Sequence, residues 1–96
     1  MKSMYVYMLK CADGKYYTGV TNNVERRLNE HNNGNNPSSF TFSRRPVALV
    51  YQQLFYDPQQ AIDFEKRLKK WSVAKKDALA NAEYDSLPLL SKKRFD

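Results

Sequence analysis

Two short runs of aromatic and aliphatic residues lie near the start of the chain and predict a pair of β-strands. Residues 4–10 and 16–21 are rich in such residues and are bounded by turn residues, which is the pattern of strands. Between them, Ala12-Asp13-Gly14 can form a turn, because glycine takes a positive φ without steric cost. The pattern therefore predicts an antiparallel hairpin.

The length of the turn decides which side chains share a face of this hairpin. A turn made by Asp13-Gly14 alone would place Tyr7 and Tyr17 on opposite faces. A three-residue loop that closes with Gly14 as a bulge places Tyr7 opposite Gly19 and both tyrosines on one face. We predict the three-residue loop, in which Gly19 leaves a gap opposite Tyr7.

The residues after the hairpin have the periodicity of an amphipathic helix. Asn22 is the predicted N-cap, and Glu25 three residues later makes a capping-box-like pattern. The helix is expected to end at about Asn32, where an Asn- and Gly-rich stretch begins.

Val24 and Leu28 define the buried stripe of this helix. At roughly 100° per residue, His31 lies about 20° from Val24, and Arg27 lies about 60° from it. Both polar side chains are therefore expected at the edge of the core-facing side. Three neighbours are expected to point elsewhere, namely Arg26, Asn29 and Glu30.

The second half of the chain predicts a third strand and two more helices. After a polar loop at residues 34–46, residues 47–55 form a strand with one face made of Val47, Leu49, Tyr51 and Gln53. Asp57 caps the next helix and Pro58 occupies its first position, which proline favours. Ser72 caps the last helix, from residue 73 to about residue 82. The longer helix has an apolar stripe of Ala61, Phe64, Leu68 and Trp71.

Glu65 is the unusual polar position of that longer helix. It projects about 40° from Ala61, beside the apolar stripe. A carboxylate at the edge of a core needs a partner, because burying an unpaired charge is costly. We therefore expect a cation, a hydrogen bond or a metal ion at Glu65.

These elements predict an α/β (α+β) fold of order β-β-α-β-α-α, with a small three-stranded antiparallel sheet flanked by helices. The length of 96 residues suffices for one hydrophobic core and is too short for two. We therefore expect a single domain over residues 1–96, with a C-terminal tail at residues 83–96.

The chain is basic, with a net charge of +6 and a pI near 9.5. This balance has two explanations of about equal weight. One is a polyanionic partner, with nucleic acid favoured over a membrane surface. The other is an ordinary solvated basic surface. No apolar run approaches the roughly 20 residues of a membrane helix. The only cysteine, Cys11, excludes an intrachain disulfide and fits a reducing cytoplasm. We expect a cytoplasmic protein without membrane contact.

Five short motifs follow one another along the chain. Tyr5-Val6-Tyr7 and Tyr17-Thr18-Gly19 end and begin with tyrosines ten residues apart, and they are followed by Arg27, His31 and Glu65. Each motif alone is weak, but five in order at this spacing make a specific signal. Over about residues 4–76, the sequence resembles the GIY-YIG nuclease superfamily, and most of all its small stand-alone bacterial members.

The resemblance implies hydrolysis of a phosphodiester bond with one divalent ion, Mg²⁺ or Mn²⁺. Glu65 would be the single protein ligand of that ion, with waters and a phosphate oxygen completing its shell. Arg27 would hold the scissile phosphate, and Tyr7 would be the general base. Tyr17 would orient the water or the phosphate, and His31 would assist proton movement or hydrogen-bond a tyrosine.

Tyr5 stands where the first family motif has glycine, and Thr18 stands where the second has isoleucine. Tyr5 and Tyr7 are therefore both candidates for the functional tyrosine, and the predicted pairing with Gly19 favours Tyr7. A phenol has a reference pKa of about 10, so a tyrosine base at neutral pH needs Arg27 and the metal ion to favour its phenolate.

Each site residue also has an ordinary structural explanation. Strand tyrosines commonly pack, an arginine stem can cover apolar surface, and a histidine at the edge of a core is usually just hydrogen-bonded. Glu65 could simply pair with Lys69 one turn later. Taken together, five such residues on faces that can converge favour the nuclease.

Basic residues crowd the polar loop, the later helices and the tail. They indicate either a solvated face or contacts with DNA phosphates. The candidates for nucleic-acid binding are Arg44, Arg45, Lys66, Lys69, Lys70, Lys75 and Lys76, with Lys92, Lys93 and Arg94 in the tail.

We therefore expect a Mg²⁺-dependent endonuclease that cleaves DNA, with branched or damaged structures in repair or recombination as candidate substrates and RNA not excluded. The chain has no room for a separate DNA-binding domain, so we expect either weak cleavage with little specificity, or targeting by a partner protein or a homodimer. The alternative is a non-catalytic nucleic-acid-binding module with the same fold. A protein-interaction domain that uses exposed aromatic residues is a third candidate.

Overall fold

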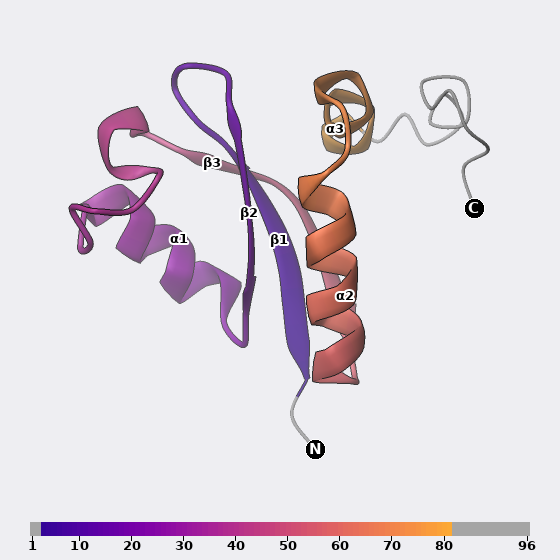
Figure 1. Cartoon of the computed structure of the whole chain (residues 1–96). Coiled ribbons are helices and arrows are strands. Elements are labelled where there is room, and N and C mark those ends of the chain that lie inside the picture. The colour runs from indigo at the N-terminus through magenta and orange to yellow at the C-terminus, as the bar shows by residue number, and fades with distance from the viewer. Residues whose placement is uncertain (1–2, 82–96) are drawn as a thin grey trace.

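A computed structural model describes residues 3–81 and shows a three-stranded antiparallel sheet with helices on both sides, which is an α+β fold (Figure 1). The order β-β-α-β-α-α confirms the order expected from the sequence. The tail expected at residues 83–96 lies outside the described residues. The elements are β1 (Met4–Lys10), β2 (Tyr16–Thr21), α1 (Val24–Asn33), a 3₁₀ turn η1 (Phe42–Arg44), β3 (Ala48–Phe55), α2 (Pro58–Lys69) and α3 (Val73–Ala80).

The β1–β2 hairpin closes through a three-residue loop. The Cys11 N–H donates to the Lys15 carbonyl at 2.8 Å, and the Gly14 N–H donates to the Cys11 carbonyl at 2.9 Å. Gly14 has a φ of 87°, a conformation that glycine adopts without strain. The loop length predicted from the sequence is therefore confirmed.

The register of the hairpin follows from that loop. Tyr7 lies opposite Gly19, and Leu9 lies opposite Tyr17, so the two site tyrosines share one face, as predicted. A Cβ atom on Gly19 would lie 2.6 Å from the Tyr7 hydroxyl oxygen, which is inside contact distance. Glycine is needed there because the Tyr7 ring occupies the space that a side chain would take.

The central strand β1, in a sheet of order β2-β1-β3, supplies side chains to two separate cores. Val6 and Met8 face one side, where they pack with buried residues of α2 and α3. Tyr7 and Leu9 face the other side, where they pack with Val24 of α1. Figure 1 shows this division, with α1 on one side of the sheet and α2 and α3 on the other.

A β-bulge interrupts the alternation of side chains in β3. Met8 pairs with Tyr51, but the next residue of β1, Leu9, pairs with Leu49. Leu49 therefore packs on the α1 side of the sheet, whereas Tyr51 packs on the α2 side. The expectation that Val47 and Leu49 share a face with Tyr51 and Gln53 is wrong, because the extra residue of a bulge moves the side chains that follow to the other face.

The helix α1 begins one residue later than expected. The Asn23 side chain accepts a hydrogen bond from the Arg26 N–H at 3.0 Å, so Asn23 is the N-cap. The Thr21 hydroxyl accepts from the Asn23 N–H at 3.1 Å, and this turn delays the helix. The prediction of Asn22 as N-cap, with Glu25 in a capping box, is therefore wrong.

The caps of the later helices are confirmed. Asp57 accepts from the Gln59 N–H at 3.0 Å, and Ser72 accepts from the Lys75 N–H at 3.2 Å.

The Tyr16 hydroxyl donates to the Asp77 carboxylate and joins β2 to α3. Burial, together with that carboxylate, raises the pKa of Tyr16 to about 12, so this bond stays formed across the neutral range.

The long loop between α1 and β3 is closed at its base by Asn32. The Asn32 amide donates to the Val47 carbonyl at 3.0 Å and accepts from the Val47 N–H at 2.7 Å. These two bonds take the place of strand pairing at Val47. As a result, β3 begins at residue 48 rather than at the expected residue 47.

Candidate active site

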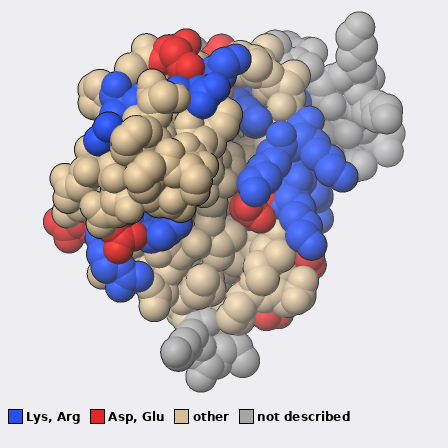
Figure 2. All heavy atoms as spheres, turned by 60° about the vertical axis from the view of Figure 1, so that its left-hand side comes forward, with Lys and Arg blue, Asp and Glu red and all other residues tan. Residues whose placement is uncertain are grey.

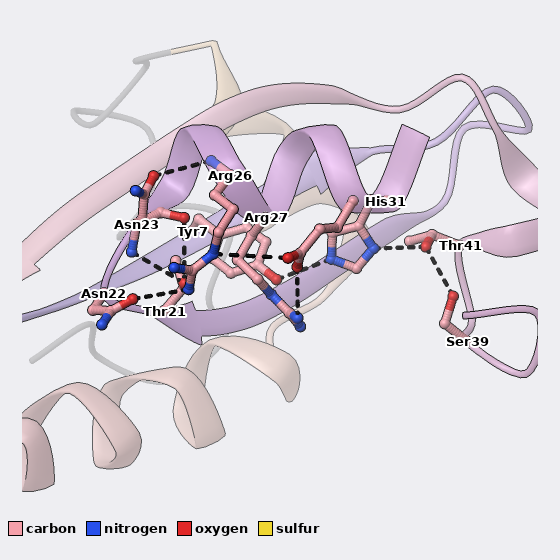
Figure 3. Close-up of polar contacts among 10 residues, drawn as sticks. Tyr7, Thr21, Asn22, Asn23, Arg26, Arg27, His31, Ser39 and Thr41 are labelled. Atoms are coloured by element: carbon pink, nitrogen blue, oxygen red, sulfur yellow. Dashed lines mark hydrogen bonds and ion pairs between the residues drawn. The ribbon is translucent and has the colours of Figure 1, made fainter. Parts of the chain in front are cut away.

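The core on the α1 side of the sheet contains a buried polar pair, Tyr7 and His31. The Tyr7 ring is only 1% exposed and the His31 side chain only 8% exposed. The Tyr7 hydroxyl oxygen lies 3.0 Å from His31 Nε2, within hydrogen-bond distance (Figure 3). Because α1 places His31 directly over the hairpin, two residues 24 positions apart in sequence form one unit.

Tyr17 lies beside this pair, on the same face of the sheet. Its ring meets the His31 ring edge-on with centroids 5.0 Å apart, and its centroid lies 6.2 Å from that of Tyr7. On its other flank, the Phe40 ring is stacked at 6.3 Å. The sequence predicted Tyr7, Tyr17 and His31 as site residues, and the fold brings the three together.

Arg27 reaches the same site from one turn earlier on α1. Its positive charge acts to lower the pKa of the nearby Tyr7 hydroxyl, and its guanidinium lies 3.1 Å from the Glu30 carboxylate. Glu30 also lies 3.7 Å from Arg26. The expectation that Glu30 points away from the site is wrong, because residues three apart on a helix are neighbours and Glu30 turns toward Arg27. The i, i+3 spacing of Arg27 and Glu30 was the feature of the sequence that could have predicted this contact.

A small cleft of about 130 Å³ lies beside Tyr17, Arg27 and His31. The cleft lies between the start of the long loop and the last turns of α1, and most of the residues that line it have polar side chains. A cleft of this chemistry suits a phosphate group, because it offers a guanidinium and several hydroxyl and amide groups. Its lining residues are Tyr17, Arg27, Glu30, His31, Gly34, Asn35, Asn36 and Ser39.

The environment changes the proton affinities of the buried pair. Burial, reinforced by the neighbouring Tyr17, raises the pKa of Tyr7 to about 12, although Arg27 acts in the opposite direction. Burial and the positive charge of Arg27 lower the pKa of His31 below its usual value. At neutral pH, Tyr7 is therefore a phenol and His31 is a neutral imidazole.

Two residues of the long loop extend this pair and were not predicted from the sequence. His31 Nδ1 lies 2.8 Å from the Thr41 hydroxyl, and the Ser39 hydroxyl lies 3.2 Å from that of Thr41. Thr41 and Ser39 belong to a polar segment without regular periodicity, so no local pattern in the sequence identifies them.

Arg44 and Arg45, predicted to bind nucleic acid, hold the long loop in place. Arg44 forms an ion pair with Asp13 at 3.0 Å through Nε, donates to the Phe40 carbonyl at 2.8 Å and lies over the Phe40 ring. Arg45 donates to the Phe42 carbonyl at 2.8 Å and lies over the Phe42 ring. Both guanidinium groups are therefore engaged within the chain.

Glu65, the predicted metal ligand, lies on α2 and thus belongs to the helix on the other side of the sheet. Its side chain is 14% exposed and pairs with Lys69 at 2.7 Å. The partner expected for this carboxylate is therefore present, and it is a cation of the same helix. The contacts of the described residues do not join Glu65 to Tyr7 or His31, although α2 packs against β2, the strand that carries Tyr17.

The lysines of α2, of α3 and of the turn between them differ in exposure and in the contacts that they make. Lys66 and Lys70 are exposed. Lys75 lies over the Trp71 ring at 4.2 Å, and Lys76 donates to the Lys69 carbonyl at 3.3 Å. Figure 2 shows Lys and Arg side chains gathered at the right of the view, with further patches at its top and left, several of them beside Asp or Glu side chains. The tail lysines Lys92 and Lys93 lie outside the described residues.

The described part of the chain offers few protein ligands to a metal ion. Within residues 3–81, no three His, Cys, Asp or Glu side chains are grouped to hold an ion. Mg²⁺ commonly keeps several waters and binds through one or two carboxylates plus substrate phosphate. Glu65 satisfies that minimal requirement because its carboxylate is partly exposed and has a single cationic partner.

A model of the GIY-YIG catalytic domain matches residues 3–77 of the chain. The chain therefore belongs to the GIY-YIG family, which confirms the resemblance seen in its motifs. It is similar to proteins named UPF0213. One from Bacillus pumilus is 45% identical over 73 residues, which cover 76% of this chain and 74% of that protein. One from Halobacterium salinarum is 43% identical over 75 residues, which cover 78% of this chain and 96% of that protein.

Two solved structures share the fold. The solution NMR structure of a UPF0213 protein from Bacillus halodurans has a TM-score of 0.54 and 34% identity, covering 95% of this chain and 99% of that one. The solution NMR structure of a protein from E. faecalis has a TM-score of 0.58 and 32% identity, covering 100% of this chain and 96% of that one. None of the helices within residues 3–81 has the length and apolar character needed to cross a membrane.

Proposed function

We propose that this protein is a metal-dependent endonuclease that hydrolyses phosphodiester bonds in DNA. The observation that carries the proposal is the buried Tyr7–His31 pair, whose His31 lines one small cleft together with Arg27. Membership of the GIY-YIG family supports the reaction class.

Tyr7 and His31 would move the proton of the attacking water together. The water oxygen bonds to phosphorus, and its proton passes to the Tyr7 oxygen. The Tyr7 proton passes to His31 Nε2, 3.0 Å away. The bond from phosphorus to the leaving oxygen breaks, and that oxygen takes a proton from solvent. This coupled transfer explains how a phenol with a pKa of about 12 can serve as a base at neutral pH.

Arg27 and Tyr17 would position the phosphate. A guanidinium can donate two parallel hydrogen bonds to phosphate oxygens and stabilises the charge that develops on them. Glu30 holds Arg27 at 3.1 Å before substrate arrives, so phosphate would compete with this carboxylate. Tyr17, at the wall of the cleft, would orient the phosphate or the water.

Glu65 would hold a single Mg²⁺ or Mn²⁺ ion, which stabilises negative charge on the phosphate and lowers the pKa of bound water. Tyr17 lies on the edge strand β2, and the helix α2, which carries Glu65, packs against that strand. A DNA backbone that crosses this edge would therefore reach both residues. The exposed Lys66 on α2 and the exposed Lys70 just after its end would then contact neighbouring phosphates, which makes binding weaken as salt rises.

The Glu65–Lys69 ion pair at 2.7 Å favours a second candidate function, a nucleic-acid-binding module without catalysis. In that case Glu65 would be a structural residue, and the site would bind phosphate without cleaving it. Metal-dependent cleavage separates the two functions.

The test uses labelled duplex, flap, four-way junction and single-stranded DNA, and a matched RNA strand, with Mg²⁺, Mn²⁺ or EDTA. Arg27→Ala and Glu65→Gln should lose cleavage and keep most binding, measured by fluorescence anisotropy. Two neighbours on the same helices provide matched controls, Arg26→Ala for the cation and Asp63→Asn for the carboxylate. Cleavage that survives in Glu65→Gln, or that is lost equally in the control variants, would contradict these roles.

A further inference from the structure

A continuous line of polar atoms runs from the centre of the site into the long loop. It passes from the Tyr7 hydroxyl to His31 Nε2 at 3.0 Å, from His31 Nδ1 to the Thr41 hydroxyl at 2.8 Å, and on to the Ser39 hydroxyl at 3.2 Å (Figure 3). Thr41 is fully buried, with an exposed fraction of 0%. A fully buried hydroxyl needs hydrogen-bond partners, because its burial is costly without them.

The proposed proton transfer requires one set of proton positions along this line. For Tyr7 to pass its proton to His31, the phenol must donate to His31 Nε2, 3.0 Å away, and that nitrogen must be unprotonated. A neutral imidazole carries one proton, so in this arrangement the proton is on Nδ1, 2.8 Å from the Thr41 hydroxyl.

We propose that Thr41 is a positioning residue of this site, whose hydroxyl accepts the hydrogen bond from His31 Nδ1–H and thereby keeps Nε2 free to accept a proton from Tyr7. The inference rests on the proposed function, in which His31 takes the Tyr7 proton. Ser39, at the wall of the cleft, accepts the Thr41 proton in turn. Nothing in this role requires Thr41 to contact the substrate.

The backbone holds Thr41 in place independently of its hydroxyl. Its carbonyl accepts from the Arg44 N–H at 3.0 Å, and the Phe42 N–H donates to the Ser39 carbonyl at 3.2 Å. The Arg44 carbonyl accepts from the Ala12 N–H of the hairpin at 2.9 Å. Replacing the hydroxyl by a methyl group of similar volume should therefore leave the loop in position.

The charges around His31 come from three elements. Arg27 and Glu30 face it from α1, the former lowering and the latter raising its pKa. Tyr7 faces it from β1, and Tyr17 faces it from β2. The Thr41 hydroxyl would also accept a hydrogen bond from Nδ1–H of a protonated His31 and so stabilise the imidazolium. Loss of the hydroxyl should therefore lower the pKa of His31 and shift the acid limb of the pH–activity profile to lower pH.

The chain contains one histidine, so ¹⁵N NMR of the full-length protein reports the His31 tautomer directly. In the wild type at neutral pH, we expect a protonated Nδ1 and an unprotonated Nε2. Thr41→Val should shift the population toward protonated Nε2, because a buried Nδ1–H without an acceptor is costly. Thr41→Ser should restore the wild-type pattern. Protonated Nε2 in the wild type, or an unchanged tautomer in Thr41→Val, would overturn the inference.

Activity gives a second readout. Loss of a hydrogen bond to a buried group corresponds to roughly a 5- to 100-fold fall in kcat, with little change in KM, and Thr41→Ser should recover most of it. Thr18→Val is the matched control, because Thr18 is also a buried threonine but lies on the α2 side of the sheet. Wild-type kcat in Thr41→Val would count against the role.

The two proposals can fail separately. If no nucleic acid is cleaved under any condition, the nuclease is refuted, while the tautomer experiment still decides whether Thr41 sets the proton on His31. If the wild type cleaves DNA and Thr41→Val has the same kcat and tautomer, only the positioning role is refuted.

Discussion

The two faces of β1 differ in chemistry although their residues alternate along one strand. On the α2 side, Val6 and Met8 pack in an apolar cluster with Leu68 and Leu79. On the α1 side, the fully buried Tyr7 has a hydroxyl that must be hydrogen-bonded, and the partner is His31. The face on the α2 side therefore stabilises the fold mainly through apolar burial. The face on the α1 side includes polar groups in a geometry that suits proton transfer.

This division has a cost on the polar side. A buried phenol and a buried imidazole stabilise the fold less than two aliphatic side chains in the same place would, because desolvation offsets their hydrogen bond. Such sites are tolerated when the rest of the chain supplies the stability. Substitutions on the two faces should consequently separate activity from stability.

The largest effect is expected for Tyr7→Phe. Removing the proton-relaying hydroxyl should lower the cleavage rate by about 10²- to 10⁴-fold, while the free energy of unfolding changes by only about 1 kcal/mol. Tyr5→Phe is the control, since Tyr5 lines a different hollow beside the start of α1. A larger loss of rate in Tyr5→Phe would show that the wrong tyrosine was chosen.

On the apolar face, Leu68→Ala should reduce stability and spare chemistry. Leu68 has no exposed surface, and its truncation should lower the free energy of unfolding by about 2–5 kcal/mol, as measured by urea denaturation. The protein that remains folded should keep its specific activity. Ile62→Ala, at a partly exposed position of the same helix, should change stability by less than about 1 kcal/mol.

Gly19→Ala should affect both properties, because this glycine contacts the Tyr7 ring. The added methyl group would lie 2.6 Å from the hydroxyl oxygen, and such overpacking typically costs about 1–3 kcal/mol. The His31 NMR signals should shift as the Tyr7 ring moves. Gly14→Ala provides the comparison, since it strains a positive φ with no atom near the new methyl group and should leave the His31 signals in place.

The smallest effect is a pH dependence of stability. Burial lowers the pKa of His31 below its usual 6.5, so the unfolded chain takes up a proton before the folded chain does. The His31 contribution to the free energy of unfolding should therefore be constant above about pH 6.5 and fall as the pH drops below it. His31→Gln should flatten this part of the curve in urea titrations. A rise in wild-type stability on acidification through that range would refute the assignment.

The sequence was sufficient for those features that depend on neighbours along the chain. The loop closed by Gly14 set the hairpin register, and with it the shared face of Tyr7 and Tyr17. Helical spacing placed His31 and Arg27 near the core. These predictions succeeded because strand alternation and helix periodicity are short-range geometry.

Features that depend on distant contacts were not predictable in this way. The bulge opposite Met8 and Leu9 has no mark in the β3 sequence, and it reversed the face of Tyr51. Thr41 reaches His31 through a long loop that is held against the hairpin by the Arg44–Asp13 ion pair and by the hydrogen bond from the Ala12 N–H to the Arg44 carbonyl. Such placement follows from tertiary packing, which local patterns do not encode.

The two hydrogen bonds between the Asn32 side chain and Val47 hold the two ends of the loop at residues 34–46 together. Its outermost residues, 35–38, are exposed, and Asn35 and Asn36 form part of the cleft wall. Length and composition can therefore change there without transmitting strain to the sheet. For protein engineering, this segment is the natural place to diversify substrate preference while the buried pair beneath it stays intact.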